Sequence, residues 1–391
     1  MFNWRFKTLV FSGAISIISS NVCAEQLTFG STDSDLGKLV VSGWLRANIQ
    51  DKDYDDNEHR LKFDAAKIAL NYDAQNFFGN FEYRCYQSDK ICDFAGLVDA
   101  NLGYKLTQDQ QVLVGLQEIP FGPGRGWSTS WYGGVLINAG LEDVHNLGIS
   151  YTAKLPTATK LDMAFFARDG GQYTGHSQDS ARYTANYVRP ENDEDPYVKE
   201  KNMFIARLQQ NIMLFEQSDL NLNVGASYWY SDIDNKNNNK TGHRNTWAVF
   251  STIKYQGANI TLTAGKNKVD NKDSLGRDYS VVGSFDSAYN VANEGDFYTA
   301  DINYIFKDVL YGWSLKPYAT YSVYKKEHKK FKDSTRNIFG AQIDKGNFSI
   351  AAEYMLGKHD PFIGGTPDAF SKGNDGDKWS KLLNILLIYN F

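Results

Sequence analysis

The feature that most constrains this chain is an alternation of apolar and polar residues with a period of two. The segment 220–231 is the clearest case, because its even-numbered residues are all apolar or aromatic and its odd-numbered residues are mostly polar or small. Successive side chains of a β-strand point to opposite faces. The pattern therefore predicts a strand with one face in an apolar environment and the other in water. Segments 41–49, 298–304 and 348–354 alternate in the same way.

Sixteen segments of this kind are predicted, and their connections alternate between short turns and long polar loops. A soluble β-sandwich has no reason to keep that order, whereas outer-membrane barrels place short turns on one rim and long loops on the other. The sequence therefore predicts an all-β fold, a transmembrane antiparallel β-barrel of about 16 strands. The predicted strands are 38–50, 61–72, 77–87, 94–105, 111–118, 147–154, 160–168, 202–214, 220–231, 245–255, 259–268, 296–306, 314–324, 335–343, 348–356 and 379–391.

Only a closed β-sheet would allow such a chain to cross a membrane. After residue 24 there is no run of eighteen apolar residues, which excludes a spanning helix. Backbone amides in hydrocarbon all need hydrogen-bond partners, so spanning strands must close the sheet on itself. Aromatic residues near the strand ends are predicted to form two interfacial girdles. These are Tyr72, Tyr104, Tyr255 and Phe306 beside short turns, and Tyr228, Tyr230, Tyr321 and Tyr354 toward long loops.

The N-terminal residues have the pattern of a secretory signal. Arg5 and Lys7 precede an uncharged apolar stretch over 8–19, and small or medium residues at 22–24 stand before Glu25. This order matches the three regions of a cleaved signal peptide, and the apolar stretch is shorter than the ~20 residues of a spanning helix. We expect residues 1–24 to be removed and residues 25–391 to form the barrel.

Charge and cysteine content agree with an exported membrane protein. Without Arg5 and Lys7, the 41 basic residues fall to 39 against 46 acidic ones, and the formal charge moves from −5 to −7. A nucleic-acid binder is usually basic, so this function is not expected. Outside the predicted signal only Cys85 and Cys92 remain, at the two ends of the short loop 88–93. An even pair in an oxidising compartment predicts a disulfide that acts as a structural clamp.

The connection 119–146 differs from the other long loops, because it is rich in glycine and in large apolar residues. Sixteen strands enclose an interior too wide for side chains to fill, so water occupies it. An apolar loop is expected to pack against the wall of that lumen and to narrow the pore. The predicted constriction residues on this loop are Phe121, Arg125, Trp127, Trp131, Tyr132, Glu142 and Asp143.

With sixteen strands and an inward loop after the fifth, the mature chain resembles the trimeric sixteen-stranded porins of Gram-negative bacteria. Pro120-Phe121-Gly122 looks somewhat like the corresponding stretch of the phosphate-selective porin O and P group, and the terminal Phe391, after alternating apolar residues, resembles the barrel-insertion strand of outer-membrane proteins. The resemblance implies a homotrimer in contact with outer-membrane lipid and lipopolysaccharide. It implies passive diffusion of small hydrophilic solutes, and no cofactor.

Charges that face the lumen are expected to set the selectivity of such a channel. The alternation of side chains along each strand selects basic and acidic residues that face the lumen, and the two sets are expected to face each other across the pore. Acidic residues are interleaved with basic ones along the whole chain, which departs from the pattern of a phosphate-selective channel. The predicted lumen-facing residues are Trp44, Arg46, Lys67, Glu82, Arg84, Asp99, Asp162, Arg168, Arg207, Trp229, Asp301, Lys316, Arg336 and Glu353.

Two other functions stay open at this point. Tryptophans in the lumen and on the inward loop would allow sugar rings to stack along the pore, which suggests uptake of oligosaccharides. A channel selective for anions such as phosphate is the other alternative. An enzyme on the barrel rim would need a Ser or Asp with a His. The six histidines all fall in predicted loops without metal-ligand spacing, and Asp143 with His145 is the nearest to a catalytic pair. We therefore expect a channel with no catalytic residue and no metal.

Overall fold

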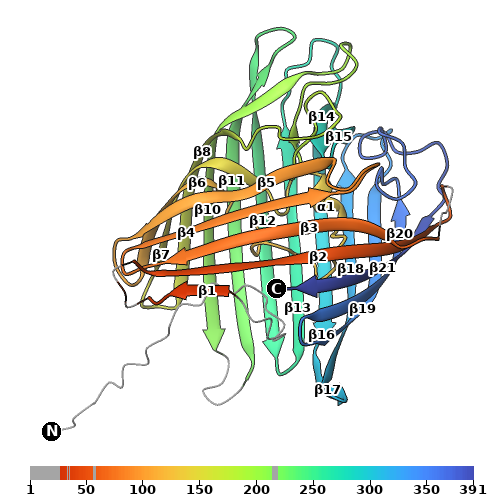
Figure 1. The fold of residues 1–391 in the computed structure, drawn as a ribbon. Helices are drawn as coiled ribbons and strands as arrows, with labels where there is room; N and C mark the ends of the chain where they lie inside the picture. The colour runs from red at the N-terminus through yellow and green to blue at the C-terminus, as the bar shows by residue number, and fades with distance from the viewer. Residues whose placement is uncertain (1–26, 33, 35, 56–58, 214–218) are drawn as a thin grey trace.

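One antiparallel sheet, closed into a barrel, forms the wall of the molecule (Figure 1). The computed structural model describes residues 27–32, 34, 36–55, 59–213 and 219–391, so the predicted signal peptide 1–24 lies outside the described residues. The wall strands are β2 (Lys38–Lys52), β3 (Lys62–Asp73), β4 (Phe77–Tyr86), β5 (Phe94–Lys105), β6 (Gln110–Glu118), β7 (His145–Lys154), β8 (Thr159–Asp169), β10 (Val198–Met213), β11 (Asn221–Asn235), β12 (Thr241–Tyr255), β13 (Ala258–Val269), β16 (Glu294–Tyr304), β18 (Trp313–Lys326), β19 (Ser334–Lys345), β20 (Phe348–Lys358) and β21 (Ser380–Asn390).

The barrel closes because β2 pairs with β3 on one side and with β21 on the other. The wall strands between them pair antiparallel in chain order. A short strand, β1 (Leu27–Gly30), pairs with the beginning of β2. Another, β17 (Phe306–Leu310), protrudes with the start of β18 from the short-turn rim (Figure 1). The predicted sixteen strands and the alternation of short turns with long loops are confirmed.

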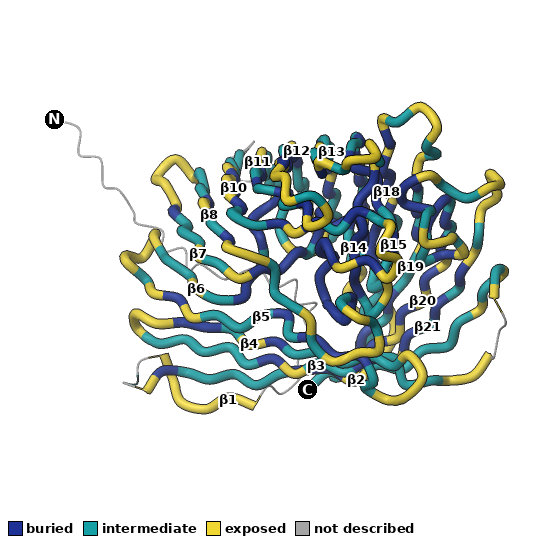
Figure 2. Tube along the Cα trace, turned by 90° about the horizontal axis from the view of Figure 1, so that it is seen from above, coloured by how far each residue is buried: buried dark blue, intermediate teal, exposed yellow. Residues whose placement is uncertain are grey.

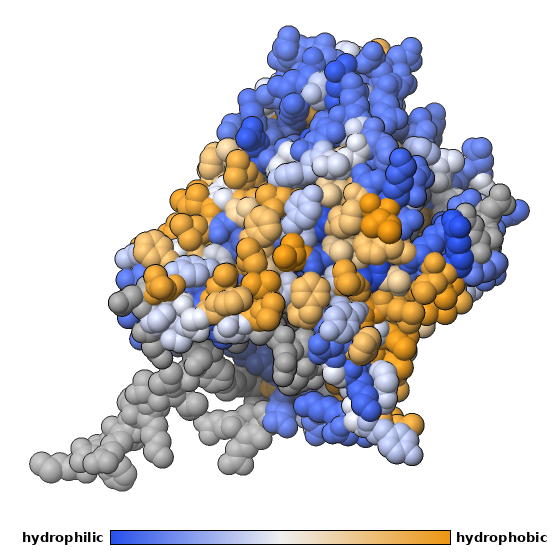
Figure 3. Space-filling view, in the orientation of Figure 1, coloured by the Kyte–Doolittle hydropathy of each residue, from blue (hydrophilic) through white to orange (hydrophobic). Residues whose placement is uncertain are grey.

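An apolar belt surrounds the middle of the barrel on the face drawn in Figure 3, below the hydrophilic long loops. Large side chains such as Leu45, Val114 and Ile302 are exposed on the wall strands. Continuous apolar surface of this kind is unfavourable in water and favourable in lipid. The predicted girdle residues Tyr104 and Tyr321 are among the exposed aromatic side chains.

The seam between the first and last wall strands ends on the C-terminal residue. The Gly43 amide donates to the Phe391 carbonyl oxygen at 2.9 Å, and the Phe391 amide donates to the Gly43 carbonyl oxygen at 3.1 Å. A Cβ atom on Gly43 would lie 2.2 Å from the Lys67 carbonyl oxygen and 2.6 Å from the Phe391 ring. Glycine is therefore required where the terminal aromatic ring covers the seam.

Parts of the long loops lie inside the outline of the barrel, where Figure 2 shows many buried residues. Strands β9 (Asn186–Tyr187), β14 (Tyr279–Ser284) and β15 (Ser287–Ala292) form a second, three-stranded sheet, and every residue of β14 is buried. The sequence predicts 169–201 and 269–295 as polar external loops, but part of each is buried. None of the helices in the described segments is long and apolar enough to cross a membrane.

Candidate functional site

The connection between β6 and β7, residues 119–144, folds into the barrel and is called the inward loop below. Its backbone is attached to the wall at several distant strands. The Gly122 amide donates to Ser227 Oγ of β11 at 2.9 Å, and the Val135 amide, in the short helix α1 (Val135–Asn138), donates to Ser322 Oγ of β18 at 3.0 Å. The loop therefore reaches across the lumen, as its apolar composition predicts.

Buried carboxylates of the wall hold the middle of the inward loop. Asp301 of β16 accepts hydrogen bonds from the Thr129 amide at 2.8 Å and from Thr129 Oγ1 at 2.6 Å. Glu353 of β20 accepts one from the Trp131 amide at 2.7 Å. The sequence predicts these acids as pore-lining charges, but Asp301 is only 2% exposed and Glu353 is 0% exposed. Both side chains point inward, and their carboxylates hold the loop.

Glu142 is a third buried carboxylate, and it lies within the inward loop itself. Its Oε1 atom accepts a hydrogen bond from the Trp127 amide at 2.6 Å, while Oε2 has no hydrogen-bond partner among the described residues. Burial raises the pKa of Glu142 to about 8, against the opposing effect of the backbone hydrogen bond. At neutral pH the raised pKa favours the protonated, uncharged form of this side chain.

Arg336 of β19 connects the inward loop to the last long loop. Its guanidinium donates to the carbonyl oxygens of Gly133 and Gly134 at 2.9 and 3.2 Å, and to Asn138 Oδ1 at 3.1 Å. It also forms an ion pair with Asp360, and both side chains are fully buried. The predicted lumen-facing Arg336 therefore acts in this structure as a cross-link between loops and is not in contact with water.

Aromatic packing fixes the beginning of the inward loop to the wall. The Phe121 ring lies 6.1 Å from Trp127, 5.8 Å from Trp229 of β11 and 6.4 Å from Phe297 of β16. Trp127 and Trp229 are each 1% exposed. Stacking of sugar rings needs an accessible aromatic face, so these two tryptophans do not fit the oligosaccharide track that the sequence suggests.

A row of side chains on β2 to β4 lies on the inner wall beside the inward loop, where the rings of Trp44 and Trp131 are 6.3 Å apart. Trp44 of β2 lies opposite Lys67 of β3, which lies opposite Arg84 of β4. Arg46, two residues after Trp44, lies over the rings of Trp44 and of Trp131 on the inward loop, at 4.9 and 5.6 Å. We call Arg46, Lys67 and Arg84 the basic wall, and the sequence predicts all three to face the lumen.

Most cations near the basic wall have an acidic partner. Arg46 pairs with Asp64, and Arg84 pairs with Glu82 at 2.5 Å. No ion pair to Lys67 is found in the described part of the chain, although its ammonium lies 6.0 Å from the Trp44 ring centre. Among the three cations of the basic wall, Lys67 is therefore the one for which no ion pair with a carboxylate is found among the described residues.

Arg125 extends from the inward loop toward β4 and β5. It contacts Glu82 at 2.9 Å, Asp99 at 3.4 Å and Asp143 at 3.1 Å. His145, at the start of β7, contributes one ring nitrogen to Asp99 and the other to Asp143, both at 2.9 Å. Burial would raise the pKa of Asp143, but Arg125 and the His145 hydrogen bond outweigh it and lower that pKa. Strand alternation predicts that Glu82 and Asp99 face the lumen, and the network that joins them to Arg125, Asp143 and His145 is visible only in the structure.

Three further predicted residues lie elsewhere on the inner wall. Asp162 of β8 accepts a hydrogen bond from Arg207 Nε of β10 at 3.0 Å, and Arg207 also donates to the Gly122 carbonyl oxygen at 3.3 Å. Lys316 of β18 lies opposite the buried Gln342 and is partly buried. These side chains point inward.

Arg168 is the predicted lumen residue that the structure places on the outside. The pairing of β7 with β8 shifts between Leu147 and Gly148, so that Leu147 lies opposite Arg168 and Gly148 opposite Phe166. The extra residue, Ala167, forms a bulge that reverses the alternation of the side chains. Arg168 is consequently exposed on the same face as Leu147.

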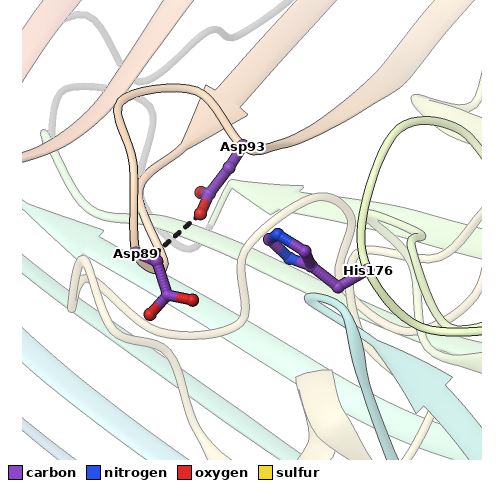
Figure 4. Close-up of side chains that lie close together, drawn as sticks. All are labelled: Asp89, Asp93 and His176. Carbon is purple, nitrogen blue, oxygen red and sulfur yellow. Dashed lines mark hydrogen bonds between the residues drawn. The ribbon is translucent and has the colours of Figure 1, made fainter.

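The predicted disulfide is present between Cys85 and Cys92, with their Cα atoms 4.9 Å apart. It encloses a turn in which the Asp93 carboxylate accepts hydrogen bonds from the backbone amides of Ser88, Asp89 and Lys90. Figure 4 shows Asp93 beside Asp89 and His176, whose ligand atoms lie within 4.8 Å of one another. Because both oxygens of Asp93 already accept backbone hydrogen bonds, we assign no metal role to this group.

Comparisons with known proteins agree on the fold. No family model matches the chain, and no curated protein matches it. Among solved structures, the outer-membrane channel DcaP of Acinetobacter baumannii has a TM-score of 0.60 and 12% identity, covering 93% of this chain and 99% of that one. OmpF of Salmonella typhi, in complex with daunomycin, has a TM-score of 0.61 and 12% identity, covering 93% of this chain and 100% of that one. An anion-selective porin from Comamonas acidovorans has a TM-score of 0.52 and 10% identity, covering 90% and 99%.

Identities this low show the fold alone. The closed sixteen-stranded barrel and the inward loop give this chain the fold of the outer-membrane porins.

Proposed function

We propose that this protein is an outer-membrane channel for passive diffusion of small hydrophilic solutes. The observation that carries the proposal is the asymmetric filling of a closed barrel. The inward loop packs against β11, β16, β18 and β20, while charged side chains between the loop and β2 to β5 keep contact with solvent. Arg125, for example, retains 33% of its side-chain exposure. Solutes would pass between the inward loop and the basic wall, with the short turns toward the periplasm.

We further propose a modest preference for anions. Asp301 and Glu353 are buried against the inward loop and Glu142 is buried within it, so three of the predicted acidic groups contribute little to the field of the pore. Lys67 lies on the basic wall, and within the described residues no carboxylate forms an ion pair with it. Rings of fixed charge at a constriction select ions of the opposite sign. The oligosaccharide alternative is less well supported, because Trp127 and Trp229 are buried.

An enzymatic role is not part of the proposal. His145 is the histidine nearest to an acid–base arrangement, but each of its ring nitrogens is already within 2.9 Å of a carboxylate. A general base needs a free nitrogen within reach of the proton it removes.

We also propose a homotrimer surrounded by lipid and lipopolysaccharide. OmpT, an outer-membrane protein of Vibrio cholerae with this fold, has a trimer form. It has a TM-score of 0.53 and 15% identity, covering 91% of this chain and 100% of that one.

Liposome swelling tests the diffusion channel. Vesicles that contain the refolded protein should swell in isotonic solutions of small neutral sugars, at rates that fall steeply with solute size. Vesicles that contain heat-denatured protein are the control. Equal rates in both preparations, with folding of the native sample verified, would refute the proposal.

A further inference from the structure

The outer wall carries a groove at the short-turn rim that the channel function does not use. It has a volume of about 460 Å³ and is lined by Trp313, Lys345, Gly346, Asn347, Phe348 and Tyr389. Its lining surface is predominantly apolar. Pockets of about 300–1,000 Å³ are large enough to hold a small ligand or part of a larger one.

Strand register shows that the groove lies on the outer face of the barrel. Lys345 of β19 lies opposite Phe348 of β20, and Phe348 lies opposite Tyr389 of β21. Phe348 is 59% exposed and Tyr389 is 40% exposed, and their ring centres are 5.1 Å apart. Trp313, at the start of β18, lies beside the same row, with Lys345 Nζ 5.8 Å from its ring centre. The groove is thus an aromatic row with one cation at the edge of the apolar belt.

The next row of outward residues toward the middle of the barrel is aliphatic. Leu315, Ile343, Ile350 and Leu387 follow one another across β18 to β21. A ligand that contacts both rows would therefore need a polar end at the rim and an apolar chain that runs toward the centre of the belt.

Lys345 determines the chemistry of the polar end. It is exposed, and no ion pair to it occurs among the residues that the structure describes. A lysine at a membrane surface is attracted to anionic lipid headgroups, and tryptophan and tyrosine favour the same interfacial depth. A free phosphate ion would use the ammonium but not the aromatic and aliphatic rows.

We propose that this groove binds an anionic phospholipid of the leaflet on the short-turn side, with its phosphate at Lys345 and an acyl chain along Phe348, Ile350 and Leu387. The proposal rests on the membrane-spanning barrel of the proposed function, but not on conductance through its lumen.

Native mass spectrometry of the full refolded barrel tests this. The protein is mixed with phosphatidylglycerol or with phosphatidylcholine of identical dioleoyl chains, and retained lipid is counted. We expect more phosphatidylglycerol to be retained. Lys345→Ala should reduce that retention roughly fivefold, the factor that one basic residue provides at an anionic membrane surface. Lys154→Ala is the control and should change nothing, because this exposed lysine at the end of β7 is on the same rim but on the inner face, opposite Lys160.

Three outcomes would overturn the lipid site. These are equal retention of both lipids by the unaltered protein, equal effects of Lys345→Ala and Lys154→Ala, and full release of lipid by inorganic phosphate with no effect of Phe348→Ala. Conductance is recorded on the same samples. Its loss in the unaltered protein would count against the channel proposal and not against the lipid site.

Discussion

Arg336 and Asp360 form a two-pronged ion pair inside the barrel, with Nε to Oδ2 at 2.7 Å and Nη2 to Oδ1 at 2.8 Å. Nη1 donates to the carbonyl oxygens of Gly133 and Gly134 in the inward loop, and Nη2 also donates to Asn138 Oδ1. One side chain of β19 thereby holds the inward loop and the last long loop in fixed relative positions. The planar guanidinium suits this task because its donors point in several fixed directions.

Replacing Arg336 should destabilise the fold strongly. Arg336→Ala leaves Asp360 buried without its partner, and breaking a buried pair in this way costs about 3–5 kcal/mol. Arg336→Lys should restore little of the lost stability, because an ammonium group cannot donate the two parallel hydrogen bonds that the guanidinium donates to Asp360. Denaturant unfolding in detergent micelles measures the change. Lys372→Ala, which removes an exposed partner of Asp368, is the control and should cost less than about 1 kcal/mol.

If Arg336→Ala lowered the free energy of unfolding no more than Lys372→Ala does, the cross-link between the loops would not contribute to stability.

Lys67 should contribute directly to ion preference. Lys67→Gln removes a charge from the basic wall, and one unit charge acting at ~4 Å in water changes an ion's free energy by about 1 kcal/mol. We expect the ratio of anion to cation permeability to fall roughly fivefold, measured as a reversal potential under a KCl gradient. Lys154→Gln at the rim should leave the ratio nearly unchanged. An unaltered potential in Lys67→Gln would remove this lysine from the selectivity mechanism.

Asp301 should control the mobility of the inward loop. Asp301→Ala leaves the partly buried Thr129 amide without its acceptor, at a cost of about 1 kcal/mol. The loop should then fluctuate, which predicts noisier open-channel current and larger conductance. Asp301→Asn keeps one acceptor oxygen and should give an intermediate trace. Quiet currents of unaltered amplitude in Asp301→Ala would show that this attachment does not hold the loop.

Glu142 predicts a pH dependence of stability with a defined sign. Its pKa is raised to about 8 in the folded protein, while an unfolded glutamate titrates near 4.3. Between these values the folded state binds one more proton than the unfolded state, so the unfolding free energy falls as pH rises from about 4.3 to 8 and then levels off. Glu142→Gln should abolish this component.

The measurement is the unfolding free energy of both proteins at several pH values. Glu142→Gln should gain stability relative to the unaltered protein, by up to a few kcal/mol at pH 8. Glu191→Gln, at an exposed loop position, is the control. Parallel pH profiles for Glu142→Gln and the unaltered protein would show that Glu142 is ionised in the fold.

The strands of this barrel were predictable because their pattern depends on a single physical division between lipid and water. The same rule failed at Arg168, where the sequence Ala164-Phe165-Phe166-Ala167 offers little contrast between the faces. A bulge at this place reverses the alternation of inward and outward side chains along β8, and the sequence pattern of the strand does not show it. Bulges are set by the pairing of two strands, which a single strand's sequence does not contain.

The inward loop was predictable from its apolar content, whereas its attachments were not. Asp301 and Glu353 resemble any lumen-facing acid in the sequence, because their partners lie 172 and 222 residues away. The sequence also contains an indication of the second sheet, but the polar composition of the surrounding segment made it easy to overlook. Within 269–295, Val281, Val282 and Val291 are apolar residues that an exposed loop does not need. Only the three-dimensional structure brings them into the barrel core.

Single-channel recording in a planar lipid bilayer tests the central claim most directly. The account predicts stepwise conductance from the refolded protein and, under a KCl gradient, a reversal potential displaced toward the chloride equilibrium potential. Absence of conductance steps from protein whose folded barrel is verified by circular dichroism and heat-modifiable mobility would contradict the claim that this barrel is a diffusion channel.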